Sequence, residues 1–89
     1  MPRVRFSQYL QRFVAAPDCA AEGTTVREAL ESVFAAHGAL RGYVLEDQGE
    51  LRRHVAIFVN GQQIRDRARQ SDAIQPDDEI LVLQALSGG

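Results

Sequence analysis

The chain has 89 residues, of which 45% are hydrophobic and 25% charged, a balance typical of one small domain with its own core and not of a disordered segment. Its net charge is −2 and every one of its ten basic residues is arginine, so the sequence disfavours nucleic-acid binding, which depends on neutralising phosphates. The single cysteine, Cys19, excludes an internal disulfide, and we expect a cytoplasmic protein with no signal peptide and no membrane partner.

The first 22 residues predict a hairpin. Polar and apolar side chains alternate over residues 3–7, which is the pattern of a half-buried strand. An apolar, turn-like stretch follows, and Pro17-Asp18 then marks a turn or sheet edge in the weaker second arm. Cys19 lies in this arm, where we interpret it as a small, partly buried structural residue.

The clearest local signal marks a helix over residues 25–37. Thr25 and Glu28 have the spacing of a capping box, which satisfies backbone amides at a helix start. Apolar residues then recur at intervals of three and four, which predicts a single stripe facing a core. Gly38 stands where a left-handed residue would end the helix, and we interpret His37 as a helix-terminal residue and not as a ligand.

The second half of the chain predicts mainly strands. We expect a short strand at 43–45 and a strong one at 54–59, separated by a polar turn. Asn60-Gly61 is the preferred pair for a tight turn and predicts a hairpin that returns through a short strand. The charge-rich stretch 65–70 is either a solvated turn or a docking patch for an acidic partner surface.

The last ten residues combine a strand with a tail that has almost no side chains. The apolar run 80–83 predicts a strand buried on both faces. Ser87-Gly88-Gly89 is slim and bendable enough to enter a narrow slot, and the carboxylate of Gly89 is ionised at neutral pH. A frayed terminus or a cloning scar would explain two glycines equally well without any function.

Together these elements predict an α+β roll, in which a mixed β-sheet carries one main helix on one face and the last strand lies centrally beside the first. Residues 1–86 would form the folded domain and residues 87–89 a flexible tail. No zinc spacing, phosphate-binding glycine loop or Ser/His/Asp set occurs in the sequence, which argues against an enzyme. The residues expected in the core are Val4, Phe6, Val26, Leu30, Val33, Phe34, Val55, Ile57, Val59, Ile80 and Val82.

Four stretches of this chain resemble the MoaD/ThiS family of sulfur carriers, which has the ubiquitin-like β-grasp fold. They are the helix start at 25–30, the strand and turn at 55–61, the turn at 75–80 and the ending at 85–89. Each is weak alone, but their order and the closing pair of glycines are fairly specific. The resemblance covers nearly the whole chain and argues against a cloning scar as the explanation of the glycines.

The resemblance implies a protein substrate and not an enzyme. An E1-like adenylyltransferase would use ATP and Mg²⁺ to adenylate the carboxylate of Gly89, and sulfur transfer would convert it to a thiocarboxylate. Because an acyl adenylate must be kept from water, the activating site is narrow and dry, and Gly88 and Ser87 would pass through it. The carrier itself would bind no cofactor, although it would act as the small subunit of an enzyme such as molybdopterin synthase.

The sulfur acceptor implied by the resemblance stays open among three enzymes. Many molybdopterin-synthase small subunits have prolines where this chain has Gln84-Ala85, and the long loop between Gly38 and Arg53 is more similar to carriers that serve a cysteine synthase. The large subunit of molybdopterin synthase and a cysteine synthase are therefore ranked equally. A thiazole synthase comes third.

We expect the activating enzyme to bind the exposed sheet face and the stretch that leads into the tail. Leu86 would be an apolar anchor, with one or more of Arg65, Arg67 and Arg69 at the rim. The alternative function is a ubiquitin-like protein-interaction module whose tail undergoes no chemistry. A native chain that stops at Gly89 favours the carrier, and a longer native chain favours the module.

Overall fold

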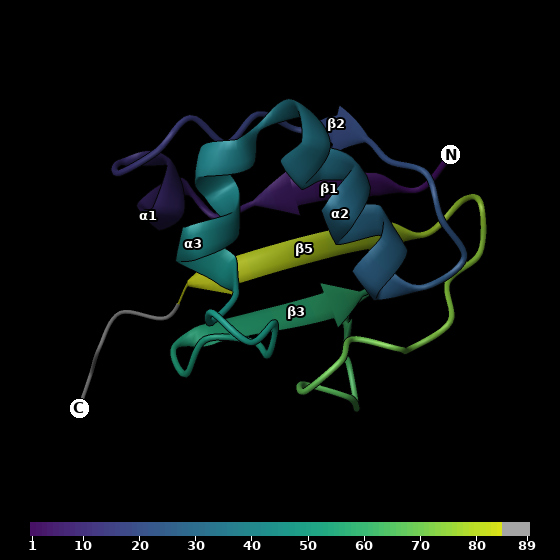
Figure 1. Ribbon diagram of the computed structural model, residues 1–89. Helices are drawn as coiled ribbons and strands as arrows, with labels where there is room; N and C mark the ends of the chain where they lie inside the picture. The colour runs from purple at the N-terminus through teal and green to yellow at the C-terminus, as the bar shows by residue number, and fades with distance from the viewer. Residues whose placement is uncertain (85–89) are drawn as a thin grey trace.

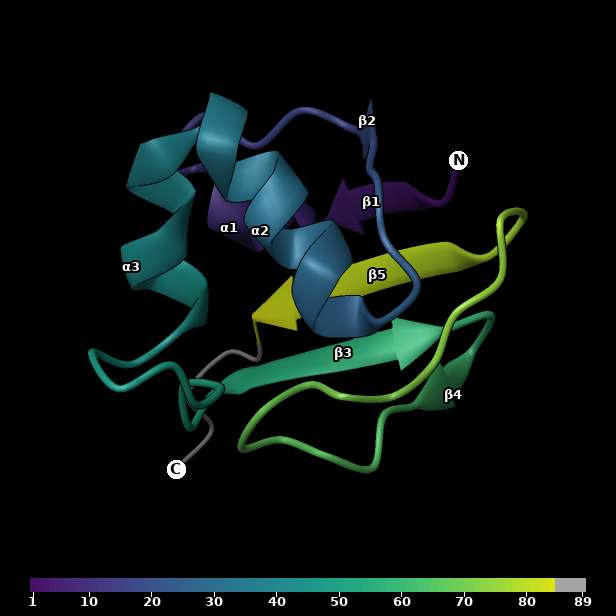
Figure 2. The ribbon, with the colours of Figure 1, turned by 45° about the vertical axis from the view of Figure 1, so that its right-hand side comes forward.

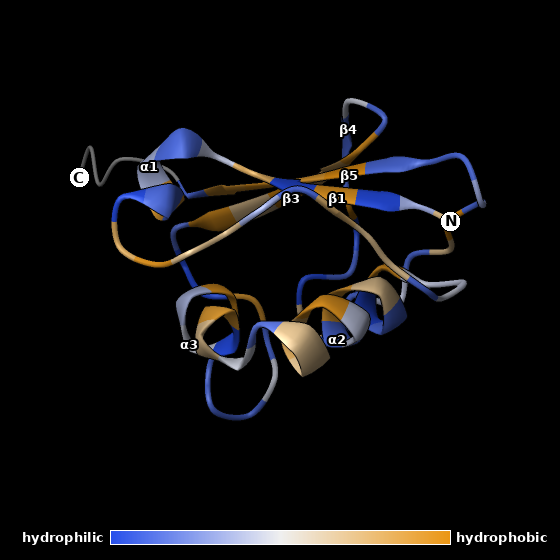
Figure 3. Cartoon of the chain, turned by 90° about the horizontal axis from the view of Figure 1, so that it is seen from above, coloured by the Kyte–Doolittle hydropathy of each residue, from blue (hydrophilic) through white to orange (hydrophobic). Residues whose placement is uncertain are grey.

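The computed structural model describes residues 1–84 and consists of a sheet whose one face is covered by the longest helix (Figure 1). In chain order its elements are β1 (Arg3–Phe6), α1 (Gln8–Gln11), β2 (Cys19–Ala20), α2 (Val26–Ala36), the 3₁₀ turn η1 (Gly38–Leu40), α3 (Arg41–Val44), β3 (Val55–Val59), β4 (Gln62–Gln63) and β5 (Glu79–Gln84). Seen from above, α2 and α3 lie on the same side of the sheet (Figure 3).

The sheet has the order β2-β1-β5-β3-β4, so the last strand of the chain lies at its centre. β5 runs parallel to β1, with Val4 opposite Ile80, and antiparallel to β3, with Ile57 opposite Val82. A parallel and an antiparallel neighbour on the same strand make the sheet mixed. The predicted α+β roll with a central last strand and one main helix is therefore confirmed.

The core lies between α2 and the sheet. All the residues expected there are buried except Val59, which is partly buried and packs against the cluster. A second group of buried side chains comes from α1, from the segment between α2 and β3, and from the loop after β4. These residues are Leu10, Leu40, Val44, Leu45, Leu51, Ile64 and Ile74.

The start of α2 is held by the capping residues that the sequence indicated. The hydroxyl of Thr25 accepts a hydrogen bond from the amide of Glu28 at 3.1 Å. The carboxylate of Glu28 accepts from the backbone amide of Thr24 at 2.7 Å and from its hydroxyl at 3.1 Å. The Glu28 carboxylate thus reaches back to Thr24, one residue before the N-cap Thr25, instead of to Thr25 itself. The hydrogen bonds from Thr24 lower the pKa of Glu28, and the backbone amide has the larger effect.

Two predictions for the segment after α2 are wrong. Gly38 does not adopt the left-handed conformation, because α2 ends at Ala36 and the chain continues into η1 and α3. Residues 43–45 do not form a strand, since Tyr43 and Val44 belong to α3. This short apolar run instead places Val44 and Leu45 in the core and leaves Tyr43 partly exposed.

Both predicted hairpins are present. β1 pairs with β2 antiparallel, although α1 forms within the connection. In the second hairpin Asn60 and Gly61 have φ values of 49° and 86°, which is the conformation that a tight turn between β3 and β4 requires. The side chain of Asn60 also donates to Asp78 at 2.8 Å and accepts from the amide of Glu79 at 2.9 Å, which ties this turn to the start of β5.

Candidate functional site

The two faces of β5 have different surroundings. Ile80 and Val82 are fully buried under the helices, but Leu81 and Leu83, which alternate with them, are only partly buried. The prediction that residues 80–83 are buried on both faces is therefore wrong. Over the described residues, the opposite side of the central strands carries no long helix to cover it (Figure 3).

An apolar groove of about 370 Å³ lies on this open face. Phe58 on β3 stands opposite Leu81 on β5 and contributes the aromatic part of the lining. Leu83 lines the same groove one residue before the end of β5. The groove therefore runs along β5 toward the point at which the tail begins.

Arg5 on β1 is the basic residue that lines the groove. Its guanidinium lies 3.5 Å from the carboxylate of Asp18 and 3.8 Å from that of Glu79, and its side chain is 56% exposed. Ion pairs this exposed are weak, generally below about 1 kcal/mol. The Arg5 charge is therefore available to a partner that lies across the groove.

The origin of the tail is fixed by both neighbouring strands. Gln84 is paired with Val55 at the start of β3, and its amide donates to the hydroxyl of Ser7 at 3.3 Å. Ser7 follows β1 and is the N-cap of α1. The predicted anchor and tail residues lie outside the described residues; they are Leu86, Ser87, Gly88 and Gly89.

The three arginines proposed for the rim are not among the residues that line the groove. Arg67 donates to the backbone carbonyl of Val55 at 2.8 Å and to that of Arg52 at 2.9 Å, so its guanidinium holds the start of β3. Arg65 and Arg69 are exposed on the loop after β4, which runs beside β3 and β4 in Figure 2. Of these three arginines, Arg65 and Arg69 have guanidinium groups that make no hydrogen bond or ion pair within residues 1–84.

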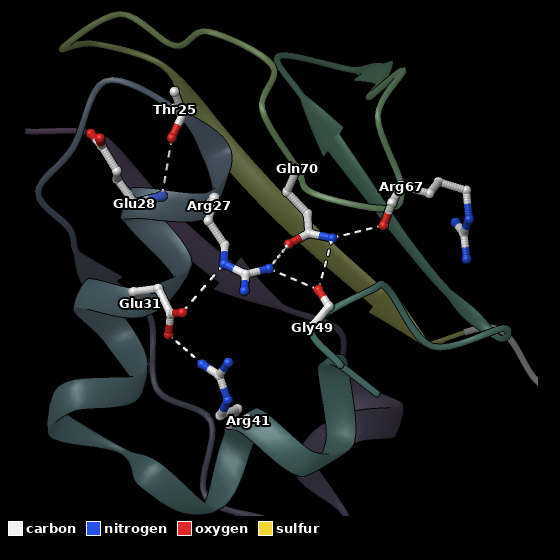
Figure 4. A network of polar contacts seen from close by, with 8 residues as sticks. All are labelled: Thr25, Arg27, Glu28, Glu31, Arg41, Gly49, Arg67 and Gln70. Atoms are coloured by element: carbon white, nitrogen blue, oxygen red, sulfur yellow. Dashed lines mark hydrogen bonds and ion pairs between the residues drawn. The ribbon is translucent and has the colours of Figure 1, made fainter. Parts of the chain in front are cut away.

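A polar network around the buried side chain of Gln70 accounts for one polar residue of the 65–70 stretch (Figure 4). Gln70 is fully buried, and its side-chain oxygen accepts from Arg27 on α2 at 2.7 Å. Arg27 also donates to the carbonyl of Gly49 at 2.7 Å, and Gln70 donates to the carbonyl of Arg67 at 2.7 Å. The network ties α2 to two loops, so part of this stretch stabilises the fold.

The remaining chemistry-bearing residues do not form a reaction centre in the part of the chain that the structure describes. Burial, and secondarily the neighbouring carboxylate of Asp18, raises the pKa of the Cys19 thiol, which disfavours the reactive thiolate. No group of three or more metal-ligating side chains occurs within residues 1–84. Within the same residues, none of the helices has the length and apolar character needed to cross a membrane.

Sequence reasoning did not single out Arg5, Phe58, Leu81 and Leu83 as a surface. A signal was nevertheless present, because residues 80–83 are all apolar while the sequence predicts only one main helix. One helix covers one face of a sheet, so the alternate side chains of a central apolar strand must face another surface.

A central β5 parallel to β1, with one main helix crossing the same sheet, defines a ubiquitin-like β-grasp protein. The sequence model of the ThiS family matches residues 4–89, and the chain belongs to this family.

The relatives agree with this assignment. The chain is 35% identical over 65 residues to small archaeal modifier protein 1 of Haloferax volcanii, a match that covers 73% of this chain and 70% of that protein. The crystal structure of that protein superposes with a TM-score of 0.78 and 26% identity, covering 99% of this chain and 98% of the other. A chain of the Amycolatopsis orientalis BexX/CysO complex has a TM-score of 0.84 over the full length of both chains, and at 21% identity it shows the fold alone.

Proposed function

We propose that this protein is a sulfur carrier whose C-terminal glycine, Gly89, is activated and converted to a thiocarboxylate. The observation that carries the proposal is the match of the ThiS family model to residues 4–89, a range that includes both the apolar groove and the tail. The groove gives a partner something to hold, and it leads to Gln84, from which only five residues extend to Gly89.

The chemistry proceeds in two steps. A carboxylate oxygen of Gly89 attacks the α-phosphate of ATP, bound with Mg²⁺ in an E1-like adenylyltransferase, and pyrophosphate leaves. Hydrosulfide, released by a sulfur donor, then attacks the acyl carbon; the bond to AMP breaks and AMP leaves, so that sulfur replaces one carboxylate oxygen. In this scheme the carrier supplies the docking surface and the acyl group, while the partner supplies the binding sites for ATP and Mg²⁺.

The partners follow from the same scheme. The activating enzyme binds the groove formed by Phe58, Leu81 and Leu83, and Arg5 faces an acidic group on it. The acceptor is a cofactor- or cysteine-forming enzyme, namely the large subunit of molybdopterin synthase, a cysteine synthase or a thiazole synthase. We place the protein in the cytoplasm with these enzymes, and propose that it binds them as a separate small protein, as CysO binds BexX.

A second candidate function is protein modification, in which the activated Gly89 is joined to an amine of a target protein. The relative at 35% identity is named a modifier, which supports this reading. Both functions need the same adenylation, so they differ only in what attacks the acyl carbon. Recovery of amide-linked conjugates from cells would favour the modifier, and recovery of free thiocarboxylate would favour the carrier.

The activation step is tested by ATP–pyrophosphate exchange with the adenylyltransferase encoded in the same genome. We expect exchange to require this chain and to disappear when Gly89 is deleted or when Gly88→Val adds bulk to the tail. The melting temperature should not change, because a terminal glycine buries very little surface. Exchange that persists without Gly89 would contradict the proposal, and so would an absence of exchange with the wild-type chain.

A further inference from the structure

The end of the molecule at which β5 stops carries exposed aromatic side chains. Phe13, just after α1, is 55% exposed and Tyr43 on α3 is 39% exposed. Among the described residues the only other large hydrophobic side chain this exposed is that of Met1, and the N-terminus lies at the opposite end of the molecule (Figure 1).

These aromatic residues form one cluster. The ring of Tyr9 on α1 packs edge-to-face on that of Phe13, with centroids 5.3 Å apart and planes at 70°. The hydroxyl of Tyr43 donates to the backbone carbonyl of Phe13 at 3.5 Å, which brings α3 against the end of α1. We call Tyr9, Phe13 and Tyr43 the aromatic cluster. Because its residues contact one another, the cluster forms one surface patch and not a set of scattered side chains.

The helix α1, which carries Tyr9 of the aromatic cluster, begins beside the origin of the tail. Ser7, the N-cap of α1, donates its amide to the carbonyl of Val82 at 2.9 Å and accepts from the amide of Gln84 at 3.3 Å. The five residues from there to Gly89 extend at most about 17 Å. An enzyme that holds Gly89 in its active site must therefore approach Gln84 closely, and α1 borders that position.

The composition of this surface suits a protein partner. Tyr, Phe and Arg are enriched at binding interfaces, where tyrosine and arginine often dominate the binding energy. Arg12 is exposed beside Phe13 and makes no ion pair within residues 1–84. An apolar partner surface with a carboxylate opposite Arg12 would complement both features.

We propose that the aromatic cluster and Arg12 form a second docking surface for the adenylating enzyme, separate from the groove on the open sheet face. This inference rests on the proposed function, since it assumes that an enzyme takes up the tail. On the enzyme, the surface beside the active site that takes up the tail packs against Phe13 and Tyr43. It places an acidic side chain opposite Arg12.

The test is the carrier dependence of ATP–pyrophosphate exchange, measured with the adenylyltransferase of the same genome. We expect the double variant Phe13→Ala/Tyr43→Ala to raise KM for the carrier about tenfold with kcat unchanged, since two interface aromatics are lost. Arg12→Glu should also raise KM, and more strongly at low salt. Gln75→Ala, an exposed change in the turn before β5, is the control and should leave KM unchanged.

The outcomes separate this inference from the proposed function. If the wild-type chain supports exchange and both changes leave KM within twofold, the second docking surface is wrong and the carrier proposal stands. If the double variant does not melt like the wild type, Arg12→Glu decides, because that side chain is exposed. If the wild-type chain supports no exchange, both proposals fall together.

Discussion

The two faces of the sheet are built from the same strands but differ in how far their side chains are buried. On the helix side Ile57, Ile80 and Val82 are almost fully removed from solvent. On the open side Phe58 and Leu81 are opposite each other on β3 and β5 and stay partly exposed. Consecutive residues of a strand face opposite ways, so β5 supports the core with one set of side chains and presents an apolar surface with the other.

With the open face as the docking surface that we propose, stability and docking become separable residue by residue. Neighbouring positions on β5 are equally apolar, so hydrophobicity alone does not distinguish them. What distinguishes them is whether α2 covers the side chain. Substitutions at adjacent positions should therefore affect different properties. A change on the covered face should lower the free energy of unfolding, and a change on the open face should weaken partner binding.

The largest effect is expected on the covered face. Ile80→Ala and Leu30→Ala each remove most of a fully buried side chain, and each should lower the free energy of unfolding by about 2–5 kcal/mol. Urea denaturation followed by circular dichroism measures this loss. A loss below about 1 kcal/mol at both positions would mean that α2 does not pack on β5 as described.

The matched substitution on the open face is Leu81→Ala. We expect a tenfold or greater rise in KM for the adenylating enzyme, about 1.4 kcal/mol of binding, because an anchor in the groove is lost. Stability should fall by less than for Ile80→Ala, since Leu81 is only partly buried. An unchanged KM together with an Ile80-like loss of stability would remove the distinction between the two faces.

An intermediate effect should separate two of the arginines after β4. Arg67→Ala leaves the carbonyls of Val55 and Arg52 without their guanidinium donor and should cost about 1–3 kcal/mol. Arg65→Ala, the exposed control, should change stability by no more than about 0.5 kcal/mol. Thermal unfolding of the two variants side by side makes the comparison. Equal melting temperatures would show that Arg67 has no structural role.

The smallest effect concerns pH. Hydrogen bonds from Thr24 hold the pKa of Glu28 below its ordinary value. Their contribution to stability is therefore complete above the unfolded pKa, about 4.3, and is lost as the pH falls through the folded value. Glu28→Gln removes this titration, so its melting temperature should fall less than that of the wild type between pH 5 and pH 3. Parallel curves for the two proteins would contradict this assignment.

The fold was predictable because local and global signals agree. The capped helix, the Asn60-Gly61 turn and the apolar strands each specify one element, and their order leaves few topologies open. The segment at 38–45 was not predictable, since a short apolar run has no period long enough to separate strand from helix. In the structure this segment packs against the core as the 3₁₀ turn η1 followed by the helix α3.

For the candidate site, the sequence indicated a region and not its residues. The exposed sheet face was expected as a docking surface, but its residues were not identified, because the pairing of Phe58 with Leu81 joins positions far apart in the sequence. The structural role of Arg67 depends on backbone carbonyls, which no side-chain pattern reveals. For Arg65 and Arg69 a rim role stays a prediction: reversing both charges should slow association with the enzyme, most at low salt.

The central claim is the chemistry at Gly89, and intact-protein mass spectrometry tests it most directly. The purified chain is incubated with its adenylyltransferase, ATP, Mg²⁺ and a sulfur donor, and is then fragmented. The account predicts that sulfur replaces one oxygen and that the change maps to Gly89. A mass that stays that of the carboxylate, or sulfur that maps to Cys19, would contradict it.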